Sequence, residues 1–447
     1  MNMRLLLLGS ATAAALSTAP ASASFIGAFH DNFSAGDNTL FIFGSAGTSG
    51  TITGLDGLSE IFTIAANGVH VQNFGSRGRE MNSSGTTNNL SFSVDSADPI
   101  SGLALNRAPF TTDMTTLLDT DALGTRYRVM AYDETLNSQM SVTAVEDGTT
   151  VTVTSPVSLN GGIAANTLTT ITLNAGESVF YQSSDDLTGA EIVSDRDVAV
   201  FAGNECTNVG GVGACDHLIS QQFSTDKFDT EFRIAENFGG GSDSDLVRVL
   251  TDTDNTEVFL NGVSQGTINA GQALDIDNVG DGVITSSQPV TVGQFVRGQG
   301  GTRTTGDPAF AIIPSVNQQL DSYAYATPIG TDVFGENYLN IAIDNSIAGS
   351  LTLNGGSVDT SMFDLINGIL FGNVSIAAGF GTISASDDFL ATISGFSSFD
   401  SYFTPIATSF SPGVSPPPPP STIPLPAAGW LLLGALGGLI TLRKRKT

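Results

Sequence analysis

The sequence is poor in the residue types from which many enzyme sites are built. Its 447 residues include 2 Cys, 1 Trp and 3 His. The histidines, His30, His70 and His217, form neither an HExxH nor an HxxxH pattern, and no phosphate-binding glycine loop or zinc-binding spacing occurs. These absences argue against a metallopeptidase or a nucleotide hydrolase. We therefore predict a protein that is not an enzyme, with no catalytic residue and no cofactor, calcium excepted as described below.

Basic residues are also scarce, and five of the 16 lie near the two ends of the chain. Arg4 is near the N-terminus, and Arg443, Lys444, Arg445 and Lys446 are near the C-terminus. The residues between them carry 11 basic against 44 acidic side chains, a net charge of -33. Such a surface repels nucleic acid and anionic lipid. We expect no nucleic-acid partner.

The two ends also carry the longest apolar segments. Residues 1–23 combine Arg4, an apolar run and small residues before a cleavage site after Ala23, which predicts a secretory signal peptide. Residues 411–422 include five consecutive prolines and predict a stiff linker. Residues 427–442 are 16 residues without a charge, which predicts a transmembrane helix, and Arg443–Lys446 would stop its transfer on the cytoplasmic side.

Residues 24–410 contain many short segments that alternate apolar and polar side chains, such as TVTVT and EVFLNG. A period of two residues bounded by Gly, Asn and Asp is typical of β-strands, and no long amphipathic helix is evident, so we predict an all-β fold. Three short patterns recur in the same order. They are marked by Gly68, Gly176, Gly271 and Gly379, by SADPI, SDRDV, SSQPV and SDDFL, and by Tyr127, Phe232 and Tyr338. This recurrence predicts about four tandem β-sheet modules, sandwich-like or propeller-like, with the four glycines in turns between strands.

The two cysteines, Cys206 and Cys215, stand close together in NECTNVGGVGACDHL. In an exported chain such an even pair predicts a disulfide. Asp216 and His217 follow the second cysteine, a combination that could assist a nucleophilic thiol, but an oxidised sulfur cannot attack a substrate. We expect Asp216 to accept hydrogen bonds from turn amides instead.

Acidic residues at nearly alternate positions occur in LDIDNVGDG. Calcium prefers several oxygen ligands that converge on one point, and Asp275, Asp277, Asn278 and Asp281 offer the best such set in the chain. The alternative is an ordinary hairpin turn, since Asp, Asn and Gly also favour turns. Both interpretations stay open at this stage.

The C-terminal segment resembles the VPLPA type of PEP-CTERM sorting segment found in Gram-negative bacteria. The motif is Ile423, Pro424, Leu425, Pro426 and Ala427, with Ile in place of the usual Val, followed by the apolar and basic parts in the expected order. The resemblance implies recognition by an exosortase-like protease that cuts near the motif in the inner membrane. The chain would be membrane-tethered first and then reach the cell surface or the medium. A permanent single-span anchor is the alternative.

Residues 25–328 resemble the N-terminal domain family of IgGFc-binding proteins. The resemblance is carried by SGLALNRAPFTTDMTTLLDTDALGTRYRVMAY, VEDGTTVTV, GAEIVSDRDVAVFAGNECTNVGGVGACDHLISQQ, RVLTDTDNTEVFLNG and PVTVGQFVRGQGGTRTTGDPAFAIIPSVNQQ. The segment QQFSTDKFDTEF lacks the Pro and Trp expected after the second cysteine. The TGDPAF segment has Ala309 where a self-cleaving GDPH motif has His. The resemblance implies an extracellular β-rich module used in adhesion or matrix contacts.

Together these features predict an exported bacterial protein of the cell surface or extracellular matrix. Its role would be adhesion, or the organisation of exopolysaccharide, through a surface glycan or protein ligand that the sequence does not name. A secreted glycan-active enzyme and a purely structural coat protein are the alternatives. A binder would retain a polysaccharide without releasing sugars, whereas a coat protein would self-assemble.

We expect the mature protein to end near the IPLPA motif. The charges of Arg443–Lys446 are costly to move through hydrocarbon, so they would halt export with residues 24–410 outside. Replacing these four residues with neutral ones is expected to misroute the uncut form. Mass spectrometry of protein recovered from the cell surface or medium locates the C-terminus, and an intact peptide through Thr447 would demonstrate a permanent anchor.

Overall fold

The computed structural model describes residues 23–76, 78–329 and 334–410, and within them the all-β prediction is confirmed. Helical structure in these ranges is limited to single 3-10 turns, namely η1 (Thr120–Ala122), η2 (Thr225–Lys227), η3 (Val316–Gln318) and η4 (Ala348–Ser350). None of the described segments forms a helix long and apolar enough to cross a membrane. The signal peptide up to residue 22, the linker 411–422, the IPLPA motif and the predicted helix 427–442 lie outside the described residues.

The first set of strands forms two antiparallel sheets, with the orders β1-β9-β4-β5 and β11-β10-β3-β6. Its strands are β1 (Ala23–Gly27), β3 (Asp37–Gly44), β4 (Ser49–Thr53), β5 (Ser59–Thr63), β6 (Val69–Ser76), β9 (Phe92–Ser96), β10 (Ile100–Ala108) and β11 (Thr111–Leu117). Three short strands accompany this set, β2 (Phe29–His30), β7 (Glu80–Met81) and β8 (Thr86–Asn88). β2 pairs with β7, and β8 extends the sheet of the second set through β16.

The second set repeats this pairing around one long strand, β17 (Glu191–Val209). The first half of β17 pairs with β12 and β14, and its second half pairs with β13 and β18. The other strands of the set are β12 (Gly124–Arg128), β13 (Ser138–Ala144), β14 (Thr149–Thr154), β15 (Thr169–Leu173), β16 (Ser178–Ser183) and β18 (Val212–Gln221). The predicted alternation is clear in β14, where every second residue is buried.

The third set has the same pairings around β24 (Gly282–Val296). Its other strands are β19 (Asp229–Ile234), β20 (Asp245–Thr251), β21 (Thr256–Leu260), β22 (Val263–Ile268), β23 (Ala273–Val279) and β25 (Ala309–Ile313). The fourth set is built around β32 (Phe380–Ser397). It contains β26 (Leu320–Ala326), β27 (Glu336–Asp344), β28 (Thr352–Leu353), β29 (Gly356–Ser357), β30 (Asp364–Ile366), β31 (Ile369–Ser375) and β33 (Asp400–Pro405).

Each long strand changes partners at one of the recurring sequence patterns. SDRDV, SSQPV and SDDFL lie within β17, β24 and β32, and SADPI lies where the first set is interrupted between β9 and β10. In two sets a buried tyrosine fixes this place. Tyr127 donates a hydrogen bond to the carbonyl of Val198 and accepts one from Gly124, and Tyr323 does the same with Phe389 and Leu320.

The other two recurring patterns are only partly equivalent. Gly68, Gly176 and Gly271 lie in the turns directly before β6, β16 and β23, and all three have positive φ. These three strands are equivalent, since they pair with β3, β13 and β20. Gly379 is also in a turn between strands, but that turn precedes the long strand β32. Tyr127 and Phe232 lie in the first strands of their sets, whereas Tyr338 lies in the second strand of the fourth set. The residue there that matches Tyr127 by its hydrogen bonds is Tyr323.

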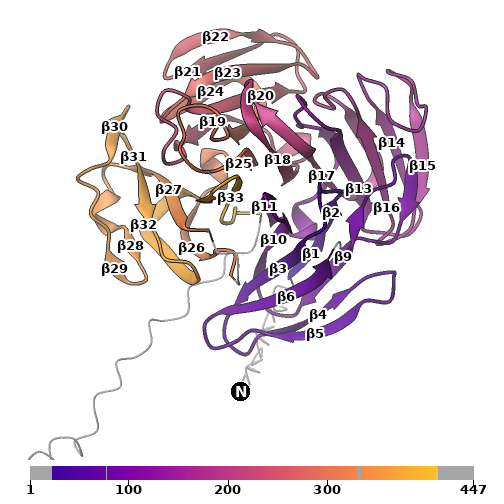
Figure 1. The fold of residues 1–447 in the computed structure, drawn as a ribbon, viewed down its shortest axis with the longest axis horizontal. Helices are drawn as coiled ribbons and strands as arrows, with labels where there is room; N and C mark the ends of the chain where they lie inside the picture. The colour runs from indigo at the N-terminus through magenta and orange to yellow at the C-terminus, as the bar shows by residue number, and fades with distance from the viewer. Residues whose placement is uncertain (1–22, 77, 330–333, 411–447) are drawn as a thin grey trace, which may run out of the picture.

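The four sets surround a centre formed by β11, β18, β25 and β33 (Figure 1). These innermost strands are neighbours in that order, and β33 lies next to β11 again. A buried cluster that includes Phe41 and Met114 of the first set and Tyr323 and Leu339 of the fourth closes the ring. Among the described residues, each innermost strand pairs with another strand along one edge, namely with β10, β17, β24 or β32. Its other edge faces the centre without a strand partner there.

Asp113, a fully buried residue of β11, satisfies these edges at one level. Its carboxylate accepts backbone N–H bonds from all four innermost strands, namely from Met114 at 2.9 Å, Ile219 at 3.1 Å, Phe310 at 3.0 Å and Phe403 at 3.2 Å. Burial raises the pKa of Asp113, and these amide hydrogen bonds oppose that shift. One side chain thereby bonds all four sets of strands at the axis.

Further along the axis, side-chain hydroxyl groups accept hydrogen bonds from the backbone amides of the innermost strands. Thr115 Oγ1 accepts from Gln221 N at 2.8 Å, Ser220 Oγ accepts from Ile312 N at 3.1 Å, and Thr404 Oγ1 accepts from Thr116 N at 3.0 Å. Each bond joins two neighbouring innermost strands. The centre of the ring is therefore held by side chains that replace the missing strand partners.

We expect Asp113→Asn to destabilise the fold by about 3 kcal/mol, because the amide nitrogen would face backbone donors and leave them unpaired. Urea denaturation of the two proteins measures the difference. Asp121→Asn is the matched control, since Asp121 is exposed, and it is expected to leave the midpoint unchanged. Equal midpoints for Asp113→Asn and the native protein would contradict the role assigned to Asp113.

Candidate ligand-binding end of the ring

The connections β10–β11, β17–β18, β24–β25 and β32–β33 lie at one end of the ring. Equivalent amides of the four innermost strands converge on Asp113, which requires these strands to run in the same direction along the axis. The four connections that enter them are therefore at the same end, which we call the hairpin end. The β2–β3 loop joins it through Asn32, whose amide donates to the carbonyl of Thr111.

Four exposed phenylalanines lie at the hairpin end. Phe33 is 61% exposed, Phe110 66%, Phe238 45% and Phe399 49%, and no other phenylalanine in the described ranges is as exposed. Phe110 and Phe399 directly precede β11 and β33 and have φ of 62° and 56°. Positive φ is unfavourable for a bulky side chain, so these two hairpins keep an aromatic residue at a position where glycine would be relaxed.

The disulfide predicted between Cys206 and Cys215 is confirmed, and it braces the β17–β18 hairpin at this end. The tip of the hairpin packs against Arg297, which follows β24. A Cβ atom added to Gly210 would lie 2.7 Å from an Arg297 nitrogen, so a larger residue there would displace the Arg297 guanidinium. The neighbouring Gly300 N donates to the carbonyl of Gly213 at 3.2 Å. The hairpin and the β24–β25 loop are thus held together.

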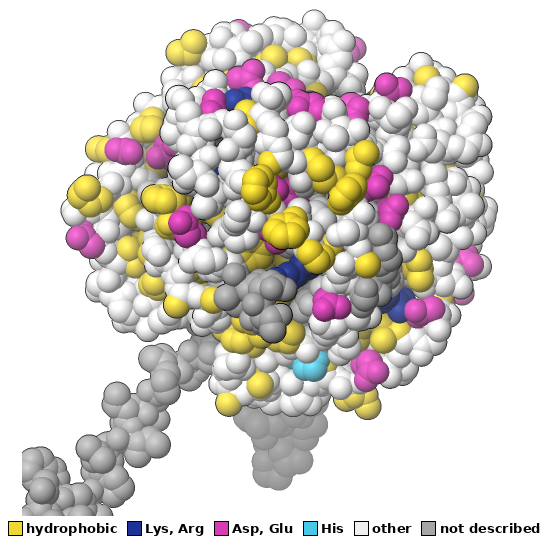
Figure 2. All heavy atoms as spheres, viewed as in Figure 1, with side chains coloured by type: hydrophobic (Ala, Val, Ile, Leu, Met, Phe, Trp, Pro, Cys, Tyr) yellow, Lys and Arg dark blue, Asp and Glu magenta, His cyan; other side chains and the backbone are white. Residues whose placement is uncertain are grey.

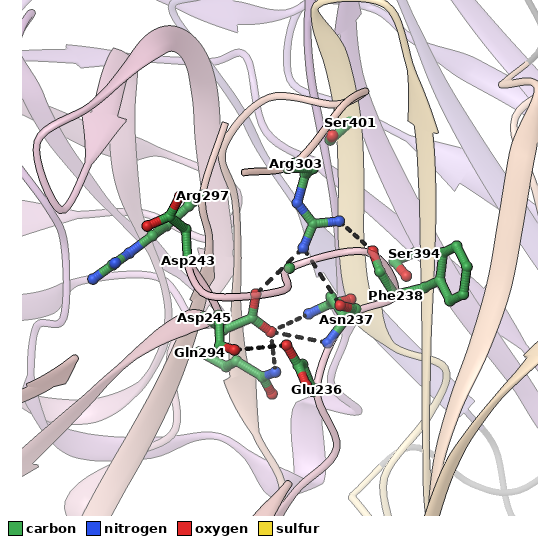
Figure 3. Close-up of polar contacts among 12 residues, drawn as sticks. Glu236, Asn237, Phe238, Asp243, Asp245, Gln294, Arg297, Arg303, Ser394 and Ser401 are labelled. Carbon is green, nitrogen blue, oxygen red and sulfur yellow. Dashed lines mark hydrogen bonds and ion pairs between the residues drawn. The ribbon is translucent and has the colours of Figure 1, made fainter. Parts of the chain in front are cut away.

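A buried polar network anchors the loops between β19 and β20 and between β24 and β25 (Figure 3). Arg303 donates to the carbonyls of Phe238 and Asn237 and lies 3.8 Å from the Asp245 carboxylate. Asp245 accepts from Asn237 N at 3.0 Å and from Gln294 Nε2 at 2.7 Å. Burial raises the pKa of Asp245 and lowers that of Arg303, because the cost of desolvation exceeds their attraction. This network holds Phe238 at the surface.

The residues predicted to bind calcium have separate partners. Asp275 forms an ion pair with Arg248 at 2.7 Å, Asp277 and Asn278 both contact Arg297, and Asp281 accepts from the backbone of Glu236 at 2.8 Å. Nowhere in the described part of the chain are three or more Asp, Glu, His or Cys side chains grouped so as to hold a metal ion. Calcium binding at this set remains a prediction, and the arrangement gives it no further support.

Asp216 and His217 are fully buried, and the adjacent Cys215 is in the disulfide rather than a free thiol. Asp216 accepts hydrogen bonds from the backbone amides of Thr112, His217 and Ser401, but all three lie in strands rather than in the turn that we expected. Burial lowers the pKa of His217 to about 4. A neutral imidazole beside an oxidised cysteine offers no nucleophile.

A pocket with a volume of about 400 Å³ lies between the first and second sets of strands, away from the four phenylalanines. It is a size that suits a small molecule. Its polar lining includes Ser24, Thr53, Ser93 and Asp95, and its apolar lining includes Ile26, Leu55 and Phe92. Ser24 Oγ donates to Asp95 at 2.7 Å, and Thr53 and Ser93 hydroxyls lie 2.7 Å apart, so these polar groups already have partners.

Among the axial carboxylates only Asp216 was predicted from the sequence to accept backbone hydrogen bonds, and none of the exposed phenylalanines was predicted. Asp113, Asp307 and Asp400 lie near the start of innermost strands, as Asp216 does, but their neighbours TDM, GDP and FDS have no shared motif beyond the aspartate. Phe110 and Phe399 lie in short connections whose ends were not predicted. The one sequence signal for the aspartates is the spacing of Asp113, Asp216, Asp307 and Asp400 along the chain, which is close to the spacing of the recurring patterns.

The described residues thus form an all-β ring with exposed aromatic side chains on loops at one end. The family model described as IgGFc binding protein matches residues 113–395, and the chain belongs to this family. Human IgGFc-binding protein is 26% identical over 291 residues, which is 63% of this chain and 5% of the human protein. The match differs in its bounds from the resemblance that we noted over residues 25–328. It begins at residue 113, and it continues to residue 395, through most of the fourth set of strands.

We expect Arg303→Gln to lower the free energy of unfolding by about 3 kcal/mol, because it leaves the buried Asp245 without a cation and two carbonyls without donors. Arg196→Gln is the control, since Arg196 pairs with Glu146 at 3.8 Å on the surface and its loss should cost less than about 0.5 kcal/mol. Chemical denaturation compares the variants. Equal effects of the two substitutions would mean that the network does not stabilise the hairpin end.

Proposed function

We propose that this protein is an extracellular binding protein that attaches to a protein ligand through its hairpin end. The observation that carries the proposal is the gathering of Phe33, Phe110, Phe238 and Phe399 in loops at that end. Exposed aromatic side chains supply most of the energy at many protein interfaces because they bury a large area at a small entropic cost. Two of them are kept in an unfavourable backbone conformation.

The charge of the chain restricts the ligand. On the face displayed in Figure 2, acidic side chains are scattered, basic ones are few, and apolar ones gather near the centre. A strongly acidic partner would be repelled, so the ligand is a neutral or basic surface. The human relative is named for binding IgG Fc, which is a protein. That name supports a protein ligand here and does not identify it, since this chain spans only 5% of the relative.

We also propose that the four sets of strands are four copies of one module. The support is the common strand pairing, which is organised around β9 and β10 in the first set and around β17, β24 and β32 in the other three. The recurring sequence patterns lie at the points where these strands change partners. In the second, third and fourth sets the long strand pairs with two strands along its first half and with two others along its second half, which supports a sandwich-like module. The arrangement of the sets around an axis is propeller-like.

Export and processing complete the proposal. The N-terminal segment and the IPLPA tail support an exported bacterial protein that an exosortase-like protease releases from the inner membrane to the cell surface or matrix. Adhesion is the role that suits such a location and an acidic, soluble body. Organisation of exopolysaccharide would need a glycan ligand, which the following experiment distinguishes.

The expected result is that the double variant Phe110→Ser/Phe399→Ser loses binding, because both aromatic anchors of adjacent hairpins are removed. An array of extracellular proteins and polysaccharides, probed with the mature chain, first identifies a ligand, and surface plasmon resonance then compares the variants. We expect at least a tenfold weaker Kd for the double variant, about 1.4 kcal/mol or more.

Ile61→Ser is the matched control, because Ile61 is 83% exposed but lies in β5 at the outer edge of the first set. It should bind as the native protein does. Retention of polysaccharides alone would favour the glycan ligand, release of sugars would favour a glycan-active enzyme, and self-assembly without any ligand would favour a coat protein. Each of these outcomes contradicts the proposed protein ligand.

A further inference from the structure

The first strand of the fold begins where the predicted signal peptide ends. β1 pairs with β9, and Ala23 lies opposite Ser96. Cleavage after Ala23 would make Ser24 the first residue of the exported chain. The backbone nitrogen of an internal residue belongs to a neutral amide, whereas that of a first residue is an ammonium group near neutral pH. Cleavage therefore adds a positive charge at the Ser24 nitrogen.

The Ser24 nitrogen lies beside carboxylates. It donates a hydrogen bond to Asp119 Oδ2 at 3.4 Å, and Phe25 forms a bridge pairing with Asp119. The Ser24 hydroxyl donates to Asp95 Oδ1 at 2.7 Å. Asp95 belongs to β9, and Asp119 lies at the corner before η1, so both come from elements distant in sequence from Ser24. A charge at the Ser24 nitrogen would thus have an acidic environment.

Asp119 is a carboxylate that has no cation. It is 8% exposed, and no lysine, arginine or histidine in the described ranges forms an ion pair with it. Burial raises the pKa of Asp119 above its usual value, and the charge of Asp121 raises it further. The amides of Asp121, at 2.9 Å, and Ser24 oppose this shift of the pKa. An adjacent positive charge would stabilise such a carboxylate.

Asp119 also holds the last residue of the described chain. Its backbone nitrogen donates to the carbonyl of Phe410 at 3.0 Å, and the Phe410 ring packs against the Phe223 ring at 5.8 Å between centroids. Lys227 lies over the same ring, but its ionic partner is Asp226 at 2.8 Å. Because β11 runs away from the hairpin end and ends two residues before Asp119, this corner is at the opposite end of the ring. It is therefore remote from the proposed binding surface.

We propose that the ammonium group created by cleavage before Ser24 forms an ion pair with Asp119, so that processing strengthens the attachment of β1 to the ring. The inference rests on the proposed export and on cleavage after Ala23. In the uncut chain a neutral amide donates to the carboxylate, and in the processed chain a charged donor replaces it at the same atom. Charge-assisted hydrogen bonds are shorter and roughly twice as strong as neutral ones. This contribution to stability exists only after the signal peptide has been removed.

The experiment compares two chains that end near the IPLPA motif, one beginning at Ser24 and one at Ser22. The longer chain keeps Ala23 and moves the ammonium group by two residues, about 7 Å in an extended strand. Asp119→Asn is made in both chains, because Asn keeps an acceptor for the amide of Asp121 but has no charge. Differential scanning calorimetry measures Tm. We expect the substitution to lower the Tm of the Ser24 chain by at least about 2 °C more than that of the longer chain.

Asp359→Asn is the matched control, since Asp359 is exposed in the fourth set, and its effect should be the same in both chains. The excess effect of Asp119→Asn should shrink in about 1 M sodium chloride, because salt screens an ion pair and not a packing contact. Equal effects of Asp119→Asn in the two chains would overturn the proposal. An excess effect of Asp95→Asn in place of Asp119→Asn would assign the ammonium group to Asp95 and would also overturn it.

A variant that does not fold leaves a second measurement. The Tm of the two native chains is then compared across salt concentrations, and a stronger decrease for the Ser24 chain is expected, whereas parallel curves contradict the ion pair. N-terminal sequencing of the exported protein tests the cleavage itself, and a first residue other than Ser24 would refute both the cleavage site and the ion pair. Ligand binding is measured separately, and Asp119→Asn should leave Kd unchanged. Loss of the ion pair and failure of the proposed binding are therefore distinguishable.

Discussion

The fold depends on how four strand edges are satisfied at the axis of the ring. Each innermost strand has one partner strand, and the opposite edge would leave its amides unpaired in the interior. The Asp113 carboxylate accepts one amide from each strand, and Thr115, Ser220 and Thr404 continue the scheme at the next level. This arrangement also fixes the strands in one register and one direction. The hairpins that carry the exposed phenylalanines lie at one end of the ring as a direct consequence.

The few basic residues are concentrated at contacts between elements that are distant in sequence. Arg126 and Arg128 of the second set pair with Asp252 of the third at 2.8 Å and 2.6 Å, and Arg248 of the third pairs with Asp186 of the second at 2.7 Å. Arg248 is nearly buried and also lies over the ring of Tyr132 at 4.7 Å. Such partly buried, multiply bonded arginines stabilise a contact far more than single surface pairs do. Two carboxylates of the predicted cation site, Asp275 and Asp277, are likewise partners of arginines, Arg248 and Arg297.

The candidate binding surface combines a rigid base with irregular connections. The disulfide between Cys206 and Cys215 and the network of Arg303 with Asp245 hold the loops, while the phenylalanines project from them. A surface of this kind tolerates changes in its exposed residues without loss of the fold, because the strand pairings beneath it do not involve those side chains.

The sequence by itself determined the all-β class and the disulfide and contained the recurring patterns, because alternation, cysteine pairing and turn residues are local properties. Gly68, Gly176 and Gly271 were placed correctly for the same reason. Only the tertiary structure decided that Tyr323 rather than Tyr338 is the counterpart of Tyr127. The two tyrosines are equivalent through their hydrogen bonds, and the bond of Tyr323 reaches Phe389, which is 66 residues away in the sequence. It also decided that Asp113, Asp216, Asp307 and Asp400 meet at the axis and that Asp275 and Asp277 have arginine partners. A carboxylate has the same local pattern whether it binds a cation, an arginine or a strand edge, and long-range packing alone selects among them.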